Sequence, residues 1–188
     1  RGSLEKSEAF IKGYITFMDK ASMLVARLVN PQPGERILDC CAAPGGKSMY
    51  MATLMNNVGS LMSCDIHEHK IELMNSNADR LGASIVHTKV QDATKLPDSW
   101  NSYFDRVLVD APCSGLGILQ KKLDMRWRKQ ESILRELPPL QLAILERAAM
   151  TVKEKGYLIY STCTLNYKEN EEVVESFLQK HKEFSIIP

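Results

Sequence analysis

The fold is decided by the stretch Arg36-Ile-Leu-Asp-Cys-Cys-Ala-Ala-Pro-Gly-Gly-Lys-Ser48. Its apolar start predicts a short strand over 36–40, and Gly45-Gly46 begins a helix that runs to about Asn56. Free N–H groups at the start of a helix bind negative charge. We therefore expect the loop over 39–48 to hold the carboxylate of a ligand.

The same loop departs from two common nucleotide-binding motifs. Gly-Gly-Lys-Ser is typical of a phosphate loop, but that motif requires glycine at the position of Cys41. The loop is not Gly-x-Gly-x-x-Gly either, so a nicotinamide cofactor is not expected.

Strands alternate with helices along the rest of the chain. This alternation predicts an α/β fold with a doubly wound, mainly parallel sheet and right-handed crossovers. The first strand is expected in the middle, with the fourth strand beside it and the fifth strand next. Pro138-Pro139 is expected to end a helical stretch, and 184–187 to begin a sixth strand. The other predicted strands are 60–66, 84–88, 106–110 and 156–161, and the other helices are 68–81 (ended by Gly82), 140–152 and 169–181.

The N-terminal region has its own signals. Asp19 is a candidate N-cap for a helix over 21–28, and the Pro- and Gly-containing segment 30–34 ends that helix. Residues 1–30 are interpreted as a lead-in segment with a helix, and 31–188 as the main domain. Arg1-Gly-Ser3 is typical of a sequence left by cloning.

Composition narrows the class of protein. The 188 residues suffice for one domain, and 44% hydrophobic with 25% charged residues is ordinary for a globular protein. No apolar run approaches the roughly 20 residues of a membrane span, and no signal peptide is visible, so a cytoplasmic location is expected.

Five cysteines without Cys-x-x-Cys spacing and four scattered histidines predict neither a disulfide scaffold nor a metal site. The oligomeric state cannot be read from the sequence.

Two of the cysteines follow predicted strands directly. Cys113 lies in Val-Asp-Ala-Pro-Cys-Ser-Gly (109–115), and Cys163 lies in Tyr-Ser-Thr-Cys-Thr (160–164). Neighbouring strands are about 4.8 Å apart, so the loops of the fourth and fifth strands bring both thiols to one substrate. Cys40 and Cys64 lie within strands and are interpreted as small buried apolar residues.

Three aspartates also follow strands. Asp65 ends the second strand, where an acid binds ribose hydroxyls or caps the next helix. Asp92 follows the third strand, where an adenine amino group is expected or an Asx turn forms. Asp110 ends a buried strand, and a carboxylate there is costly without partners, which favours a functional role.

One segment is strongly basic although the net charge is only +1. Residues 120–129 carry five cations, one acid and a tryptophan. Such a stretch binds RNA phosphates and stacks on a base, or it is a solvated loop.

Taken together, these motifs resemble the Sun (RsmB-like) branch of the RNA cytosine-C5 methyltransferases, the 16S rRNA methyltransferase B type. The resemblance runs from about Gly13 to the last helix. It rests on Asp39-x-Cys-Ala-Ala-Pro-Gly-Gly-Lys47, Asp65, Asp92, Asp110-Ala-Pro-Cys-Ser-Gly115, Arg126-Trp127 and Ser161-Thr-Cys-Thr164.

The resemblance implies a Rossmann-like class I methyltransferase domain over 31–188, S-adenosylmethionine as methyl donor, and an RNA cytosine as acceptor. Ribosomal RNA is the expected partner, with transfer RNA as an alternative. Asp110 would face the cytosine and border the cofactor, Cys163 would be the nucleophile, and Cys113 would assist release. The other cofactor-binding residues implied are Cys41, Ala42, Ala43, Pro44, Gly45, Gly46, Lys47, Asp65 and Asp92.

The chemistry suits these residues. Addition of a thiolate at C6 of cytosine makes C5 nucleophilic, and Asp110 is placed to stabilise the charge at N3. A second thiol fits the later loss of the C5 proton. DNA cytosine methyltransferases use the Pro-Cys thiol as nucleophile, which keeps Cys113 open as the attacking group.

Two further expectations concern the extent of the chain. The Sun branch usually has an N-terminal RNA-binding domain and two more strands, so we expect a catalytic core with an exposed sheet edge. The alternatives are a non-catalytic RNA-binding remnant that retains the cofactor site, and a small-molecule methyltransferase.

Overall fold

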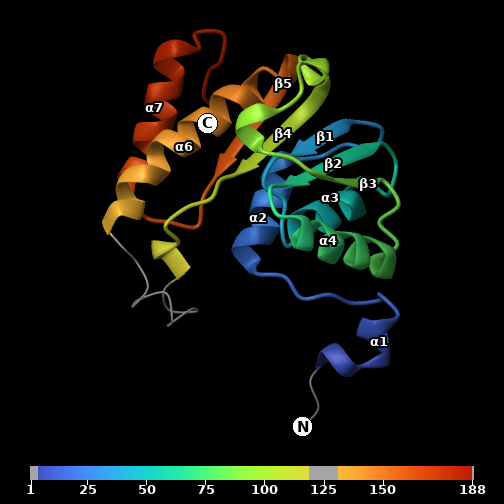
Figure 1. The fold of residues 1–188 in the computed structure, drawn as a ribbon. Helices are drawn as coiled ribbons and strands as arrows, with labels where there is room; N and C mark the ends of the chain where they lie inside the picture. The colour runs from blue at the N-terminus through green and yellow to red at the C-terminus, as the bar shows by residue number, and fades with distance from the viewer. Residues whose placement is uncertain (1–3, 119–130, 188) are drawn as a thin grey trace.

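A computed structural model describes residues 4–118 and 131–187, which form a five-stranded sheet between two layers of helices (Figure 1). The strand order is β3-β2-β1-β4-β5, and every neighbouring pair is parallel. This arrangement confirms the predicted α/β class and the central position of the first strand. The strands are β1 (Arg36–Asp39), β2 (Ser60–Asp65), β3 (Val86–Val90), β4 (Phe104–Asp110) and β5 (Val152–Ser161).

Helices cover both faces of this sheet. On one face lie α2, α3 and α4, and on the other lie α6 and α7, while the short α1 stands apart near the N-terminus (Figure 1). The helices are α1 (Glu8–Ile11), α2 (Lys20–Val29), α3 (Gly46–Leu54), α4 (Glu68–Leu81), α6 (Glu131–Ala149) and α7 (Glu171–Lys180), and short 3-10 turns include 116–118 and 167–169.

The core follows from the alternation of side chains along each strand. Ile37 and Leu108 belong to the cluster packed against α2 and α3. Leu38, Cys40 and Val107 point to the opposite face and pack with residues of α6 and α7. Because both faces are covered, the central strands are apolar almost throughout.

Cys40 and Cys64 are fully buried in this core, as the sequence predicts. Burial raises the pKa of both thiols, that of Cys64 to about 12. They are packing residues rather than nucleophiles.

The predicted helix ends are confirmed at two places. Asp19 caps α2, since its Oδ1 accepts the N–H of Ala21 at 2.9 Å. Gly82 ends α4 in the left-handed conformation. The division of the chain at residue 30 stays a prediction.

Two boundaries were wrong. Pro138 and Pro139 do not end a helix but lie inside the single helix α6. Ile144, Leu145 and Ala148 of α6 are buried in the core against the sheet. The stabilisation from this burial outweighs the loss of the two backbone hydrogen bonds that the prolines cannot donate. In addition, β5 begins at Val152 rather than 156, with an irregular register opposite Phe104–Arg106.

The predicted sixth strand is also absent over 184–187, within the part of the chain that the structure describes. Phe184 instead packs edge-on against Phe177 of α7, with ring centroids 5.4 Å apart. A strand needs a hydrogen-bonded neighbour, whereas this segment is held by an aromatic contact. β5 is therefore the edge of the described sheet, which agrees with the expectation that later strands are lacking.

The basic segment 120–129, with Arg126 and Trp127, lies outside the described residues. Within 4–118 and 131–187, no helix is long and apolar enough to span a membrane.

Candidate active site

The loop between β1 and α3 forms an accessible helix start. Gly45 has φ +98, and a Cβ there would meet Met74 Cγ at 2.9 Å, so only glycine fits without strain. At Gly46 a Cβ would meet nothing within 4 Å, which leaves open space above the first N–H groups of α3. The predicted cofactor residues 41–47 all lie in this loop or in the first turn of α3.

Asp39 lies at the base of the loop and was given no role in the sequence analysis. Its side chain is fully buried, and Oδ2 accepts a 2.7 Å hydrogen bond from Ser48 Oγ. Oδ1 has no partner among the described residues. Burial raises the pKa of Asp39 to about 7. The exposed helix start at Gly46 fits the carboxylate of S-adenosylmethionine, and Asp39, which solvent does not reach, supports that start from within through Ser48.

Asp65 and Asp92 lie at the ends of β2 and β3, on the same edge of the sheet. Asp65 Oδ1 accepts the N–H of His67 at 2.9 Å, and Asp92 Oδ1 accepts the N–H of Thr94 at 2.9 Å. The bonds from Thr94 hold the pKa of Asp92 below its usual value. Asp92 thus forms the predicted Asx turn, and its Oδ2 lies 3.7 Å from Lys95 Nζ. Asp65 does not cap α4, because the N-cap of α4 is His67 and has no side-chain cap bond. Their roles toward a cofactor stay predictions.

Asp110 joins the cofactor loop to β5. Lys47 Nζ lies 2.6 Å from Asp110 Oδ2, and Ser161 Oγ donates to Asp110 Oδ1 at 2.7 Å. The parallel register places Asp110 directly opposite Ser161. The expected cost of an acid at this strand end is offset by these two partners. Ser161 belongs to a quoted motif, but the sequence did not indicate its bond to Asp110.

The two loop cysteines meet beyond these strand ends. Cys113 Sγ and Cys163 Sγ are 3.0 Å apart, and the N–H of Cys163 donates to Cys113 Sγ at 3.2 Å. Cys163 is exposed, and Cys113 is partly buried. The structure therefore brings together the two residues that the strand order predicted to be neighbours.

The proton shared by the two thiols has a preferred position. Either sulfur could donate in the contact between them, whereas the N–H of Cys163 donates to Cys113 Sγ alone. The hydrogen bond with the Cys163 side chain and the backbone bonds from Cys163 and Gly115 lower the pKa of Cys113 to about 7 despite burial. The negative sulfur of Cys113 in turn raises the pKa of Cys163. In the resting protein, the first thiolate forms on Cys113.

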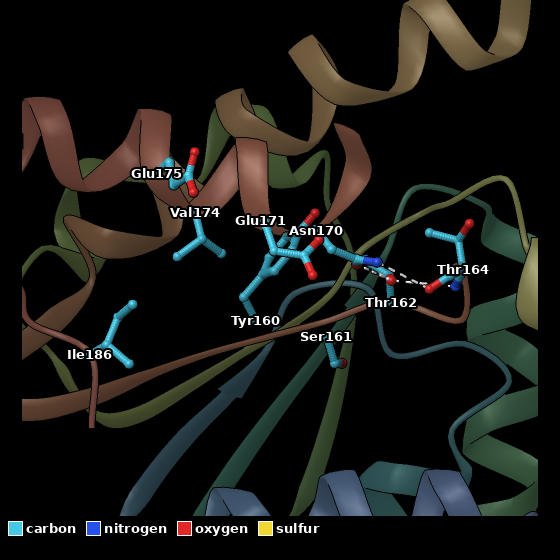
Figure 2. A pocket seen from close by; sticks show the side chains of 9 residues that line it. All are labelled: Tyr160, Ser161, Thr162, Thr164, Asn170, Glu171, Val174, Glu175 and Ile186. Atoms are coloured by element: carbon cyan, nitrogen blue, oxygen red, sulfur yellow. Dashed lines mark hydrogen bonds between the residues drawn. The ribbon is translucent and has the colours of Figure 1, made fainter. Parts of the chain in front are cut away.

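The Cys163 loop borders a pocket of about 530 Å³ beside the start of α7 (Figure 2). Its lining side chains come from the end of β5, from α7 and from the C-terminal segment: Tyr160, Ser161, Thr162, Thr164, Asn170, Glu171, Val174, Glu175 and Ile186. Asn170, which lines this pocket, and the buried Glu169 beside it were not predicted, because a run of polar residues at 169–172 is also typical of an ordinary helix start.

Across the described ranges, no group of three or more His, Cys, Asp or Glu side chains is arranged to hold a metal ion. The lysines and arginines expected to bind RNA at 120–129 are not described.

Comparisons with known proteins bear on the same motifs. The family model for the "16S rRNA methyltransferase RsmB/F" matches residues 26–188. A probable ribosomal RNA small subunit methyltransferase B of Bacillus subtilis is 45% identical over 98% of this chain and 41% of its own length. The chain thus spans about two fifths of the curated relatives it matches.

Solved structures agree with this match. The crystal structure of PH0851 has a TM-score of 0.96 and 36% identity, and the alignment covers 100% of this chain and 43% of that chain. NSun6 from Pyrococcus horikoshii, crystallised with SFG, has a TM-score of 0.87 and 34% identity over 96% of this chain and 46% of that chain.

Proposed function

Since the chain belongs to the RsmB/F family of 16S rRNA methyltransferases, we propose that it methylates C5 of a cytosine in small-subunit ribosomal RNA. S-adenosylmethionine is the methyl donor of this family, as the sequence predicted. The observation that carries the finer proposal is the 3.0 Å approach of Cys113 and Cys163 Sγ. One thiol is sufficient to form an adduct with a pyrimidine, whereas a pair supports both its formation and its breakdown.

The loop residues hold the donor. The exposed start of α3 at Gly46 binds its carboxylate, and the buried Asp39 holds this helix start in place through its bond from Ser48 Oγ. Asp65 binds the ribose through Oδ2, and Asp92 binds the adenine amino group through Oδ2 in place of its exposed contact with Lys95. When bound, the donor supplies an electrophilic methyl group to C5 of the cytosine.

Cys163 is the nucleophile in this proposal, because it is the more exposed sulfur. As Cys163 Sγ bonds to C6, its proton passes to the Cys113 thiolate over the 3.0 Å between the sulfurs. The electron pair of the C5=C6 bond moves toward N3, and N3 takes a proton that Asp110 passes on from water, so that no negative charge remains on the ring.

Breakdown of the adduct uses the other sulfur. Cys113 first releases its proton to water and then accepts the proton from C5. The C5–H electron pair restores the C5=C6 bond, and the C6–S bond breaks to leave Cys163 as a thiolate. A thiol pKa of about 7 suits Cys113 to act as both acid and base near neutral pH.

The test separates the two sulfurs by replacing each with alanine. We expect Cys113→Ala to accumulate a covalent RNA adduct that resists denaturation, because attack proceeds but elimination does not. Cys163→Ala is expected to form no adduct and to lose at least about 1,000-fold in methyl transfer. The measurements are denaturing gels with 16S rRNA and digestion of tritium-labelled product to identify 5-methylcytosine.

Cys64→Ala is the matched control, since Cys64 is a buried packing residue of the core and has no role in the proposed site. It is expected to form no stalled adduct. An adduct in Cys163→Ala but not in Cys113→Ala would assign attack to Cys113. Cofactor binding without methyl transfer, in a version extended to the full length of the relatives, would support the non-catalytic RNA-binding alternative.

A further inference from the structure

We propose that the dipeptide Glu169-Asn170 is a positioning element that sets the distance between the sulfur atoms of Cys113 and Cys163. The inference rests on the proposed function, in which both sulfurs act on one cytosine. Neither residue contacts the sulfurs directly. They hold the two loops that carry them.

Glu169 holds the loop of Cys113. Its side chain is fully buried, and Oε2 accepts the N–H of Ser114, the residue after Cys113, at 2.7 Å. Gln141 Nε2 donates to the same oxygen at 3.1 Å and to the carbonyl of Pro112, the residue before Cys113, at 2.9 Å. The carboxylate thus fixes the backbone on both sides of Cys113, directly on one side and through Gln141 on the other.

Asn170 holds the loop of Cys163 in the same way. Thr162 Oγ1, before Cys163, donates to Asn170 Oδ1 at 2.6 Å, and Asn170 Nδ2 donates to the carbonyl of Thr164, after Cys163, at 3.1 Å (Figure 2). Adjacent residues of one chain therefore clamp two loops that are 50 residues apart. Because the clamps share a backbone, the loops cannot separate without breaking one of them.

Two hydrogen-bond contacts also join the Cys113 loop directly to the Cys163 loop. Ser114 Oγ and Thr164 Oγ1 are 2.8 Å apart, and the N–H of Gly117 donates to the carbonyl of Cys163 at 3.1 Å. A Cβ at Gly117 would lie 2.9 Å from that carbonyl oxygen, so the approach depends on glycine. These contacts hold only if Glu169 and Asn170 keep the loops in place.

The charge of Glu169 distinguishes it from an ordinary packing residue. Burial acts to raise its pKa, but the bonds from Ser114, Asn166 and Gln141 outweigh burial and lower it, so the carboxylate is ionised. Within the described residues it has no lysine or arginine partner. An apolar side chain would fill this position at lower cost. The benefit of the carboxylate is that one small group accepts bonds from several segments at once.

The experiment measures how readily Cys113 and Cys163 form a disulfide in the protein without RNA, because this rate depends on the distance between their sulfur atoms. A diazene dicarboxamide oxidant takes two electrons and two protons from the two thiols, forms the S–S bond and becomes a hydrazine. The rate of the Cys113–Cys163 disulfide, followed by peptide mass spectrometry, reports how often the sulfurs meet. We expect Glu169→Ala and Asn170→Ala each to form it at least tenfold more slowly than the original chain.

Two conservative variants separate positioning from folding. Glu169→Gln is expected to stay within threefold of the original rate, because its amide oxygen accepts from Ser114. Its amide nitrogen takes the place of Oε1 and loses the bond that Oε1 accepts from Asn166 Nδ2, so the expected small decrease in rate comes from that lost bond. Glu169→Asp is one methylene shorter and is expected to resemble Glu169→Ala. The matched control is Glu172→Ala, an exposed glutamate of α7.

Methyl transfer provides the second measurement. The slow-disulfide variants are expected to lose kcat at least tenfold with KM for RNA changed less than threefold, and Glu169→Gln to keep most of kcat. An unchanged disulfide rate in folded Glu169→Ala, or in Glu169→Asp if alanine prevents folding, would overturn the inference. If the disulfide rates change as expected but no variant, including the original chain, methylates RNA, the proposed function fails and the positioning role stands.

Discussion

At the scale of the residue, the chemistry depends on which sulfur carries the proton. Cys163 is exposed and free to meet a substrate, but its hydrogen bond to Cys113 places the resting thiolate on Cys113. A cysteine can thus be the attacking group and still be the protonated member of the pair before substrate arrives. The pair titrates as one unit, so the pKa of each sulfur depends on the other.

Replacing Cys163 by alanine is therefore expected to raise the pKa of Cys113. The wild-type thiolate of Cys113 should reach half its full alkylation rate near pH 7. Loss of the S–H donor disfavours the charged form, so the midpoint moves up toward that of a free thiol. The measurement is the pH dependence of iodoacetamide labelling at Cys113. Cys41→Ala should leave the midpoint unchanged, and an unchanged midpoint in Cys163→Ala would contradict the shared proton.

At the scale of the element, α6 shows how packing overrides local preference. The helix contains Pro138 and Pro139 in its interior, yet it continues to Ala149. Ile144 and Leu145 are buried in the core shared by β4 and α7, and Gln141 is buried beside the cysteine loops. The helix is held by what its second half contacts rather than by its intrinsic propensity.

Replacing both prolines by alanine is expected to stabilise the protein. Proline in a helix interior costs about 3 kcal/mol relative to alanine, part of which is recovered through the stiffer unfolded chain. We expect the free energy of unfolding in urea to rise by about 1–3 kcal/mol for Pro138→Ala/Pro139→Ala. Leu140→Ala, at an exposed position of the same helix, should change it by less than about 1 kcal/mol. A loss of stability in the double variant would mean that the prolines favour the packed geometry of α6.

At the scale of the whole molecule, Arg106 connects α2 to the sheet. From β4, its Nε donates to Glu35 Oε2 at 2.7 Å, and Nη1 donates to the carbonyl of Val29 at the end of α2 at 2.9 Å. Its guanidinium lies 4.6 Å from the ring centre of Tyr157 on β5. One largely buried cation thus joins four segments far apart in the sequence.

Removal of the Arg106 guanidinium is expected to destabilise the folded protein. Arg106→Met removes the side-chain donor of the Val29 carbonyl and leaves the Glu35 carboxylate with the N–H of Gln32 but no cation, and we expect a loss of about 3–5 kcal/mol in the free energy of unfolding. The double variant Arg106→Met/Glu35→Met should recover part of this loss, because the unpaired charge is gone. Lys12→Met, which breaks the exposed pair with Glu8, should cost less than about 1 kcal/mol. A loss equally small in Arg106→Met would contradict this account.

The sequence by itself determined where the strands, the helix ends and the loops that follow the strands lie. Apolar runs followed by Gly45-Gly46, by Cys113 and by Cys163 predict parallel strands that each end in a loop bearing functional groups, and the described sheet has that order. These signals are readable because strand period, glycine conformation and capping act over a few residues. The motifs likewise identified the family before any contact was known.

Only the tertiary structure decided which side chains support the site. The bond of Ser161 to Asp110 and the bond of Glu169 to the Cys113 loop join residues 51 and 55 positions apart, and the burial of Asp39 likewise arises only in the packed molecule. Polar residues at a strand end or helix start have the same local pattern whether they face water or a buried partner. The difference is the burial of the group and the direction of its hydrogen bonds, which arise when distant segments pack together.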